Sequence, residues 1–221
     1  MKKALEKALF SIQFINIRDF AKDKHKQVDD YPFAHKQGML LKCDVLASAI
    51  RSIENYNDAK IVYTSPQGKA LASPWAKDCA TSKQDLIIIV GYFEGIDARL
   101  FELFDCEEIS IGDVILTSGE LPALTIVDAI VRYIPGVLGN ENSVENESIL
   151  SGALETPQYT HPREFEGLEV PDVLRSGNHK AVAEHERQQS LQKTLYKRPG
   201  LLASNVLSKK DKQYIVDSLS N

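Results

Sequence analysis

Short, nearly continuous apolar runs alternate with segments of helical periodicity in the first 140 residues of the chain. The two clearest runs, residues 60–64 and 85–90, predict buried strands. Helical patterns lie before and between them, and at residues 44–53 the apolar side chains fall on one face at 3.6-residue spacing. Because continuous apolar runs are typical of parallel strands covered on both faces, the pattern predicts an α/β fold with a largely parallel sheet.

A turn and a third strand are expected beyond these runs. The strand at 60–64 continues into Ser65-Pro66-Gln67-Gly68, which fits a type I turn with proline second and glycine fourth. We therefore expect the strand to end there. Residues 109–116 are the next candidate strand, interrupted by Gly112.

A helix should begin near Glu120, three residues after Thr117. A threonine followed three positions later by a glutamate is typical of a capping box, and Pro122 suits the first turn of a helix. Pro135-Gly136 should end this helix. Its expected buried stripe consists of Leu124, Val127, Val131 and Ile134.

The composition changes after Gly139. Residues 140–151 are rich in Asn, Glu and Ser and have few large apolar side chains, which predicts a linker. The remaining chain is helical in pattern, with candidate helices at 178–195 and 208–219. The second of these has Ser208-Lys209-Lys210-Asp211 at its N-cap.

The overall charge is modestly negative, with 26 Lys and Arg against 31 Asp and Glu and a formal net charge of −5. This balance argues against a protein that coats nucleic acid without specificity, although a local basic patch can still bind it. Residues 175–212 hold nine Lys or Arg against three Asp or Glu. Two interpretations stay open for this segment: it contacts phosphates, or it is a solvated helical face.

Cysteine and histidine usage predicts neither a metal site nor a disulfide framework. The three cysteines are far apart and form no CxxC motif, so free thiols in a reducing cytoplasm are expected. The five histidines show no metal-ligand spacing. The longest aliphatic run, residues 86–90, is too short to span a bilayer, and no GxGxxG or GxxxxGK[ST] motif occurs.

Several motifs in a fixed order carry more specific information. They are GYFEGIDAR at 91–99, SIGDVILTSGELPA at 110–123, RYIPGVLG at 132–139, PQYTHP at 157–162, VPDVL at 170–174 and SGNH at 176–179. In this order and spacing they strongly resemble the bacterial tRNA (guanine-N1)-methyltransferases, the TrmD family of the SPOUT class. The resemblance runs from about Leu9 to the C-terminus.

The resemblance implies a SPOUT-type α/β fold, with a parallel sheet, a deep trefoil knot and a small α-helical C-terminal domain. It implies a knotted S-adenosylmethionine-binding domain at 1–139, an interdomain linker at 140–152 and a helical tRNA-binding domain at 153–221. The implied cytoplasmic enzyme is a homodimer that moves a methyl group from S-adenosylmethionine to ring nitrogen 1 of the guanine 3′ of the tRNA anticodon. The family also suggests that a magnesium ion assists.

The same resemblance implies three cofactor-binding loops. The matching residues are Tyr63, Ser65, Pro66 and Gly68 in the first loop, Gly91, Glu94 and Gly95 in the second, and Ser110, Ile111, Gly112, Leu116, Ser118 and Gly119 in the third. Glycine allows the backbone to approach a ligand closely, and exposed backbone groups can hydrogen-bond to adenine. Taken one at a time, each glycine is better interpreted as a plain turn residue.

Two residues match the catalytic positions of the family. Methylation of guanine at nitrogen 1 requires a base to remove the proton there, and negative charge then develops on the exocyclic oxygen. Arg132 matches the arginine that stabilises this charge. The base is an Asp in the family pattern Ser-x-x-x-Asp-Ser, and the matching stretch 143–148 (SVENES) places Glu147 there.

The chain departs from the family pattern at other places as well. The sequence lacks the strand and Phe-Pro turn with which the family begins, so we expect either that the first strand is missing or that the start codon is misassigned. The Gly-rich stretch of the family is replaced at residues 34–39 by AHKQGM. Two alternatives to the implied function therefore stay open. One is a SPOUT methyltransferase with another RNA target, and the other is a catalytically weakened relative that binds tRNA or the cofactor.

Overall fold

The computed structural model describes residues 2–34, 37–138, 152–203 and 207–220 of the 221-residue chain. The chain divides into two compact units, Met1–Glu141 and Asn142–Asn221. The predicted linker at 140–151 lies outside the described residues.

The first unit is built on three parallel strands in the order β4-β3-β5. Their bounds are Lys60–Ala70 for β3, Leu86–Ile89 for β4 and Cys106–Ser110 for β5. Successive side chains of a strand point to opposite faces. In β3, Ile61 and Tyr63 pack into one core while Val62 packs into another. The sheet is therefore buried on both faces, which confirms the predicted α/β fold with a parallel sheet.

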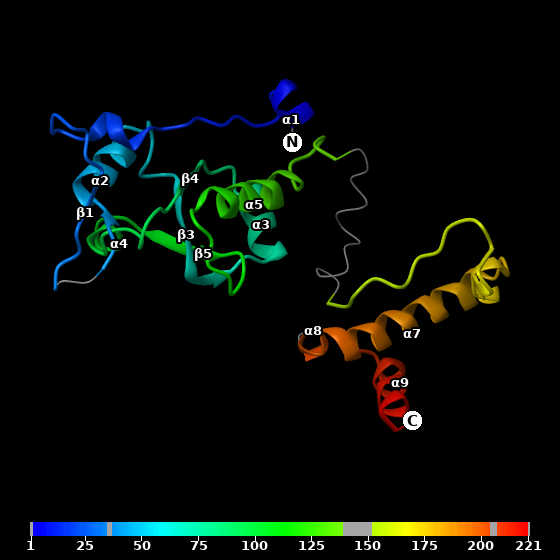
Figure 1. Cartoon of the computed structure of the whole chain (residues 1–221). Coiled ribbons are helices and arrows are strands. Elements are labelled where there is room, and N and C mark those ends of the chain that lie inside the picture. The colour runs from blue at the N-terminus through cyan, green and yellow to red at the C-terminus, as the bar shows by residue number, and fades with distance from the viewer. Residues whose placement is uncertain (1, 35–36, 139–151, 204–206, 221) are drawn as a thin grey trace. The chain divides into compact units, whose positions relative to one another are not determined.

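Helices cover these two faces (Figure 1). On one side lie α2 (Cys43–Arg51) and α4 (Arg99–Leu103), and on the other lie α3 (Ser73–Thr81) and α5 (Glu120–Val131). The first core contains Val45, Leu46, Ile50, Leu100 and Phe104, and the second contains Ala76, Ile109, Ile126 and Ile130. The other elements of the unit are α1 (Lys2–Glu6), the 3-10 helix η1 (Ile17–Phe20) and the short antiparallel pair β1 (Asp29–Asp30) and β2 (Leu40–Leu41).

β3 extends beyond the predicted end of its strand. Thr64 and Lys69 both lie opposite Ile109 of β5, so residues 65–68 loop out between them and pairing resumes as far as Ala70. The predicted strand end is wrong because hydrogen bonding to β5 continues on the far side of this bulge.

β5 lies earlier in the sequence than predicted. It ends at Ser110, whose hydroxyl donates to the Gly112 carbonyl at 3.0 Å and accepts from the Gly112 N–H at 3.1 Å. Gly112 itself has a φ of +141°, outside the extended region. The predicted continuation to residue 116 is therefore wrong. The strand at 106–110 could not be predicted from its apolar pattern, because Glu107 and Glu108 interrupt that pattern.

α5 begins where predicted but is capped and packed differently. Its N-cap is Gly119 and no side-chain cap bond forms, so the predicted capping box of Thr117 and Glu120 is wrong. Of the predicted stripe, Val131 is buried but Leu124 is 53% exposed, and the other buried residues of the helix are Ile126 and Ile130. Apolar side chains surround this helix, so the pattern could not select the buried face.

The second unit is mostly helical. α7 (His179–Lys197) and α9 (Lys209–Ser220) lie within two residues of the predicted helices, with the short α8 (Gly200–Ala203) between them. Ser208 accepts from the Asp211 N–H at 3.1 Å, and the Asp211 carboxylate accepts from the Ser208 N–H at 3.0 Å. This reciprocal pair confirms the predicted N-cap of α9.

A hairpin and an extended segment complete the second unit. The hairpin pairs β6 (Glu164–Phe165) with β7 (Leu168–Glu169) and is followed by the 3-10 helix η2 (Asp172–Arg175). The extended segment lies along α7, where the Leu154 N–H donates to Thr194 Oγ1 at 2.8 Å and Ser190 Oγ donates to the Leu154 carbonyl at 2.6 Å.

Candidate functional site

The three candidate cofactor loops leave the same edge of the sheet. β3, β4 and β5 are parallel, so their carboxyl ends lie together. The bulge at 65–68 interrupts the end of β3, residues 91–95 follow β4, and residues 110–119 follow β5. Ligands of open parallel sheets bind at this edge.

The first loop packs on the neighbouring strand. Ser65 is buried, and its Oγ accepts from the Gln67 N–H at 3.2 Å, whereas Pro66 is exposed. Gly68 lies so close to β5 that a Cβ there would overlap the Glu108 carbonyl group. A glycine is therefore required at 68 for the bulge to sit on the strand.

Tyr63 forms the floor of the second loop. Its side chain is buried beneath Gly91 and Gly95, and a Cβ on Gly95 would lie 3.3 Å from the phenol oxygen. Burial raises the pKa of Tyr63, and the nearby carboxylate of Glu108 raises it further. The phenol therefore keeps its proton at neutral pH and can donate a hydrogen bond.

The second loop is also fixed to a segment that is distant in the sequence. The Glu94 N–H donates to the Met39 carbonyl at 3.0 Å, and the Leu41 N–H donates to the Gly95 carbonyl at 2.9 Å. The Glu94 side chain lies against Gly38, whose φ is +88° and where a Cβ would overlap it. Gly38 belongs to the stretch in which most family glycines are replaced.

The third loop returns to the second. Within it Ile111 and Ser118 are half-buried and Leu116 is 40% exposed. At its end the Gly119 N–H donates to the Gly91 carbonyl at 2.8 Å. The structure therefore brings the second and third predicted loops into direct contact.

The glycines of the site have two different physical roles. A Cβ at Gly68, Gly91 or Gly119 would meet protein atoms, so these glycines let the loops pack on one another and on the sheet. Gly112 has a positive φ and no other heavy atom within 4 Å of a Cβ position. Gly112 therefore leaves open space beside the backbone, as a ligand site requires.

Only one of the two candidate catalytic residues is described. Arg132 directly follows the last residue of α5 and is half-buried. Glu147 lies outside the described residues.

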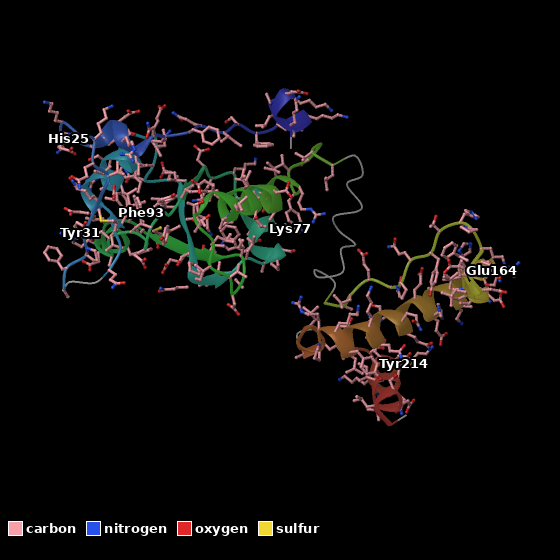
Figure 2. The ribbon with its side chains drawn as sticks, in the orientation of Figure 1. His25, Tyr31, Lys77, Phe93, Glu164 and Tyr214 are labelled. Carbon is pink, nitrogen blue, oxygen red and sulfur yellow. The ribbon has the colours of Figure 1, made fainter. Side chains whose placement is uncertain are left out.

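Neither a metal cluster nor a membrane-spanning helix is found in the described parts of the chain. No group of three or more His, Cys, Asp or Glu among those residues could hold a metal ion. His25 lies exposed at the edge of the first unit (Figure 2). No helix in the described ranges is long and apolar enough to cross a bilayer.

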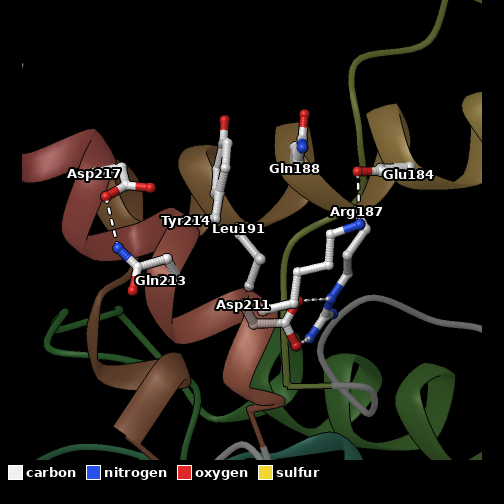
Figure 3. Close-up of a pocket in the computed structure, with 9 residues that line it drawn as sticks. Glu184, Arg187, Gln188, Leu191, Asp211, Gln213, Tyr214 and Asp217 are labelled. Carbon is white, nitrogen blue, oxygen red and sulfur yellow. Dashed lines mark hydrogen bonds and ion pairs between the residues drawn. The ribbon is translucent and has the colours of Figure 1, made fainter.

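The second unit has a hollow of about 360 Å³ between α7 and α9 (Figure 3). Arg187 donates to both carboxylate oxygens of Asp211, at 3.1 and 3.0 Å, and Lys210 pairs with Glu184 at 2.7 Å. Hydrogen bonds from Arg187 lower the pKa of Asp211 to about 2, against the opposing effect of burial. Arg187 and Lys210 are therefore already paired with carboxylates. At these two positions the pairing favours the interpretation of a solvated helical face over phosphate contact.

Other basic residues of the same segment are exposed to solvent. They are Arg175, Lys180, Lys197, Arg198, Lys209 and Lys212. A phosphate-binding surface on this unit could use these side chains without breaking the ion pairs of Arg187 and Lys210.

Comparison with known proteins identifies the family. Residues 1–204 match the family described as tRNA (Guanine-1)-methyltransferase TrmD. The chain belongs to the TrmD family. This result confirms the resemblance found in the motifs at 91–99, 110–123 and 132–139.

Individual TrmD relatives are similar over nearly the whole chain. A tRNA (guanine-N(1)-)-methyltransferase of Staphylococcus carnosus is 46% identical over 215 residues, which cover 97% of this chain and 87% of the relative. Proteins of the same name from Dictyoglomus turgidum and Syntrophomonas wolfei are 46% and 47% identical. The matched regions cover 96% and 99% of this chain, and 85% and 88% of the two relatives, respectively.

The sequence motifs did not single out Thr64 as a residue of the candidate site. Thr64 stands between the matched residues Tyr63 and Ser65 and is buried where the three loops meet. The only signal in the sequence was a polar residue at the end of an apolar strand.

Proposed function

We propose that this protein transfers a methyl group from S-adenosylmethionine to ring nitrogen 1 of the guanine 3′ of the anticodon in tRNA. The observation that carries this proposal is the TrmD family match over residues 1–204. The clustering of the matched loops at the carboxyl edge of a parallel sheet supports it.

The loops at the carboxyl edge of the sheet are suited to binding S-adenosylmethionine. The residues that would hold it are those of the three loops, from Tyr63 to Gly68, Gly91 to Gly95 and Ser110 to Gly119. Open space beside Gly112 and a protonated Tyr63 phenol supply room and a hydrogen-bond donor. The bound cofactor would supply a methyl group activated by a positively charged sulfur. We assign no residue of this chain to magnesium.

The chemistry at guanine is assigned to two side chains. The Glu147 carboxylate accepts the proton of ring nitrogen 1, which frees the lone pair that receives the methyl group. The negative charge that develops on the exocyclic oxygen is stabilised by the Arg132 guanidinium. Because a neutral ring nitrogen 1 has no available lone pair, removal of its proton is the step that requires the protein.

The proposal includes a deep trefoil knot in a domain at 1–139, a linker at 140–152 and a tRNA-binding domain at 153–221. The Gly119 to Gly91 hydrogen bond supports the knot, because it draws the chain after β5 back to the loop after β4. We also propose a cytoplasmic homodimer. Exposed apolar side chains of the third loop and α5 support a covered surface there: Val114, Ile115, Leu116, Leu121 and Leu124.

A methyl-transfer assay tests the function directly. The full chain would be incubated with methyl-labelled S-adenosylmethionine and a tRNA transcript that has guanine 3′ of the anticodon. The matched control is the same transcript with adenine at that position. We expect label only in the first transcript, recovered as N1-methylguanine after nuclease digestion and mass spectrometry.

The two alternatives give different results in the same assay. Label in another RNA, with none in this tRNA, would indicate a methyltransferase with a different target. Cofactor binding by calorimetry without transfer to any RNA would indicate a catalytically weakened relative.

A further inference from the structure

A buried hydroxyl lies where the three loops meet. Thr64 is the last residue of β3 before the bulge and is only 5% exposed. Its Oγ1 donates to the Ile89 carbonyl at 3.4 Å and accepts from the Gly91 N–H at 3.5 Å. One side chain of the central strand thus contacts both the last residue of β4 and the start of the second loop.

The same hydroxyl is packed against the third loop. A Cβ on Gly119 would overlap Thr64 Oγ1 and would also lie 2.7 Å from the Gly91 nitrogen. Gly119 in turn donates its N–H to the Gly91 carbonyl at 2.8 Å. Thr64, Gly91 and Gly119 therefore form one compact group, in which the Thr64 side chain lies beside both loops.

We propose that Thr64 is a positioning residue for the cofactor site. Its hydroxyl holds the second and third loops in the arrangement that binds S-adenosylmethionine, and it acts through Gly91 and Gly119 rather than on the reacting atoms. This inference rests on the proposed function. It assigns a role to a residue that lies beside the matched cofactor positions but is not one of them.

The size of the effect follows from the hydrogen-bond lengths. Both bonds are longer than the usual range for protein hydrogen bonds, so each contributes less than a short one. Loss of the hydroxyl should therefore weaken cofactor binding by about two- to fivefold, the lower part of the range expected for a hydrogen bond. Loss of the nearby γ-methyl group should have a smaller effect on binding.

Two pairs of variants separate the hydroxyl from the methyl group. Thr64→Val keeps the shape and removes the hydroxyl, whereas Thr64→Ser keeps the hydroxyl and removes the methyl. We expect the calorimetric Kd for S-adenosylmethionine to rise in Thr64→Val and to stay near the parental value in Thr64→Ser. Thr64→Ala and Thr64→Ser differ only by the hydroxyl, so they give the same comparison if Thr64→Val does not fold.

Kinetics provides a second readout. For Thr64→Val the KM for S-adenosylmethionine should rise, while kcat at saturating cofactor and the KM for tRNA stay near parental. A side chain that only packs would give the opposite ranking, with Thr64→Val close to the parent and Thr64→Ser or Thr64→Ala equally weakened. That ranking, or equal affinity in all variants, would overturn the inference and leave the proposed function standing. A parent chain that does not bind S-adenosylmethionine would overturn both.

Discussion

The Tyr63 ring lies directly beneath Gly91, so that a Cβ on Gly91 would come within 2.9 Å of both ring carbon Cε2 and the phenol oxygen. Tyr63 belongs to β3 and Gly91 follows β4, so this contact joins the first and second loops. Because the Tyr63 side chain is buried, the ring has little room to move away. A side chain at position 91 is therefore excluded by packing.

Gly91→Ala should weaken cofactor binding. The added methyl group must displace the Tyr63 ring or the loop, and overpacking of this kind costs about 1–3 kcal/mol. If the whole cost falls on the bound state, the Kd for S-adenosylmethionine, measured by calorimetry, should rise by about 5- to 150-fold. Gly200→Ala is the control, since nothing lies within 4 Å of its Cβ position and its affinity should not change. Parental affinity in Gly91→Ala would show that the ring yields without cost.

Much of the sheet could be predicted because β3 and β4 are apolar on both faces. β5 could not, because Glu107 looks like a solvent-facing residue in the sequence. In the structure its carboxylate accepts from Trp75 Nε1 at 2.9 Å and pairs with Lys60 Nζ at 3.1 Å. These partners are 32 and 47 positions away from Glu107 in the sequence, so the local sequence pattern cannot predict them.

Contacts between distant residues also limited how much of the candidate site could be predicted from the sequence. The family motifs located the glycines, but the reason for Gly68, Gly91 and Gly119 is a contact with residues that are distant in the sequence. Thr64 shows this most clearly, because its partner Gly91 is 27 residues away and only the folded chain brings them together. For the opposite reason, the N-cap of α9 was predictable, because Ser208 and Asp211 are three positions apart.

The Glu107 contacts predict a pH response of the first unit. Burial alone would raise the pKa of Glu107, but hydrogen bonds from Trp75 and Lys60 outweigh it and the pKa is lowered. A carboxyl with a lowered pKa stabilises the fold fully above its unfolded pKa, about 4.3, and loses that effect as pH falls through its folded pKa. Urea unfolding, followed by emission of the single tryptophan, Trp75, should show a midpoint that falls below about pH 4.

Variants of the same network provide the control. Glu107→Gln cannot titrate, so its urea midpoint should be lower at pH 7 and should change less as the pH falls below the unfolded pKa of glutamate, about 4.3. The exposed Glu102→Gln should keep the parental pH response. An identical pH response in Glu107→Gln would assign the effect to other carboxyls.

Asp211→Asn should destabilise the second unit. The substitution removes the charge that receives two hydrogen bonds from Arg187, and hydrogen bonds to charged groups contribute about 1.5–3 kcal/mol each at most. Because Arg187 is 39% exposed, water compensates part of the loss, and we expect about 1–2 kcal/mol from urea unfolding followed by circular dichroism. Glu184→Gln breaks the exposed pair with Lys210 and should destabilise the unit less than Asp211→Asn does. Equal losses in the two variants would contradict a special role for Asp211.

The proposed homodimer can be tested by complementation. If a shared site takes Arg132 from one chain and Glu147 from the other, Arg132→Ala and Glu147→Gln homodimers should both be strongly impaired. Co-expression of the two variants forms mixed dimers, in which one of the two sites regains both groups. We expect methyl transfer to reappear only in the mixed sample. A chain that remains monomeric at micromolar concentration in light scattering would contradict the proposal.

Glu147→Gln provides the sharpest test of the catalytic assignment. The variant keeps the size of the side chain but cannot accept a proton, so methyl transfer should fall by about 10²–10⁴, the usual contribution of a positioned general base. The Kd for S-adenosylmethionine should be nearly unchanged, because Glu147 is not one of the residues assigned to the cofactor loops. Glu145→Gln, two positions away, is the matched control and should be as active as the parent.

Glu147→Asp then asks whether this chain is adapted to the longer side chain. A misplacement near 1 Å can cost about a hundredfold in rate. If the surrounding loop is spaced for glutamate, Glu147→Asp will be slower than the parent; if glutamate is a poor substitute for the aspartate of the family, Glu147→Asp will be faster. The two carboxylates differ in pKa by only about half a unit, so a difference in rate would come from reach rather than basicity. A Glu147→Gln variant as fast as the parent would show that Glu147 is a solvated residue and that the base lies elsewhere.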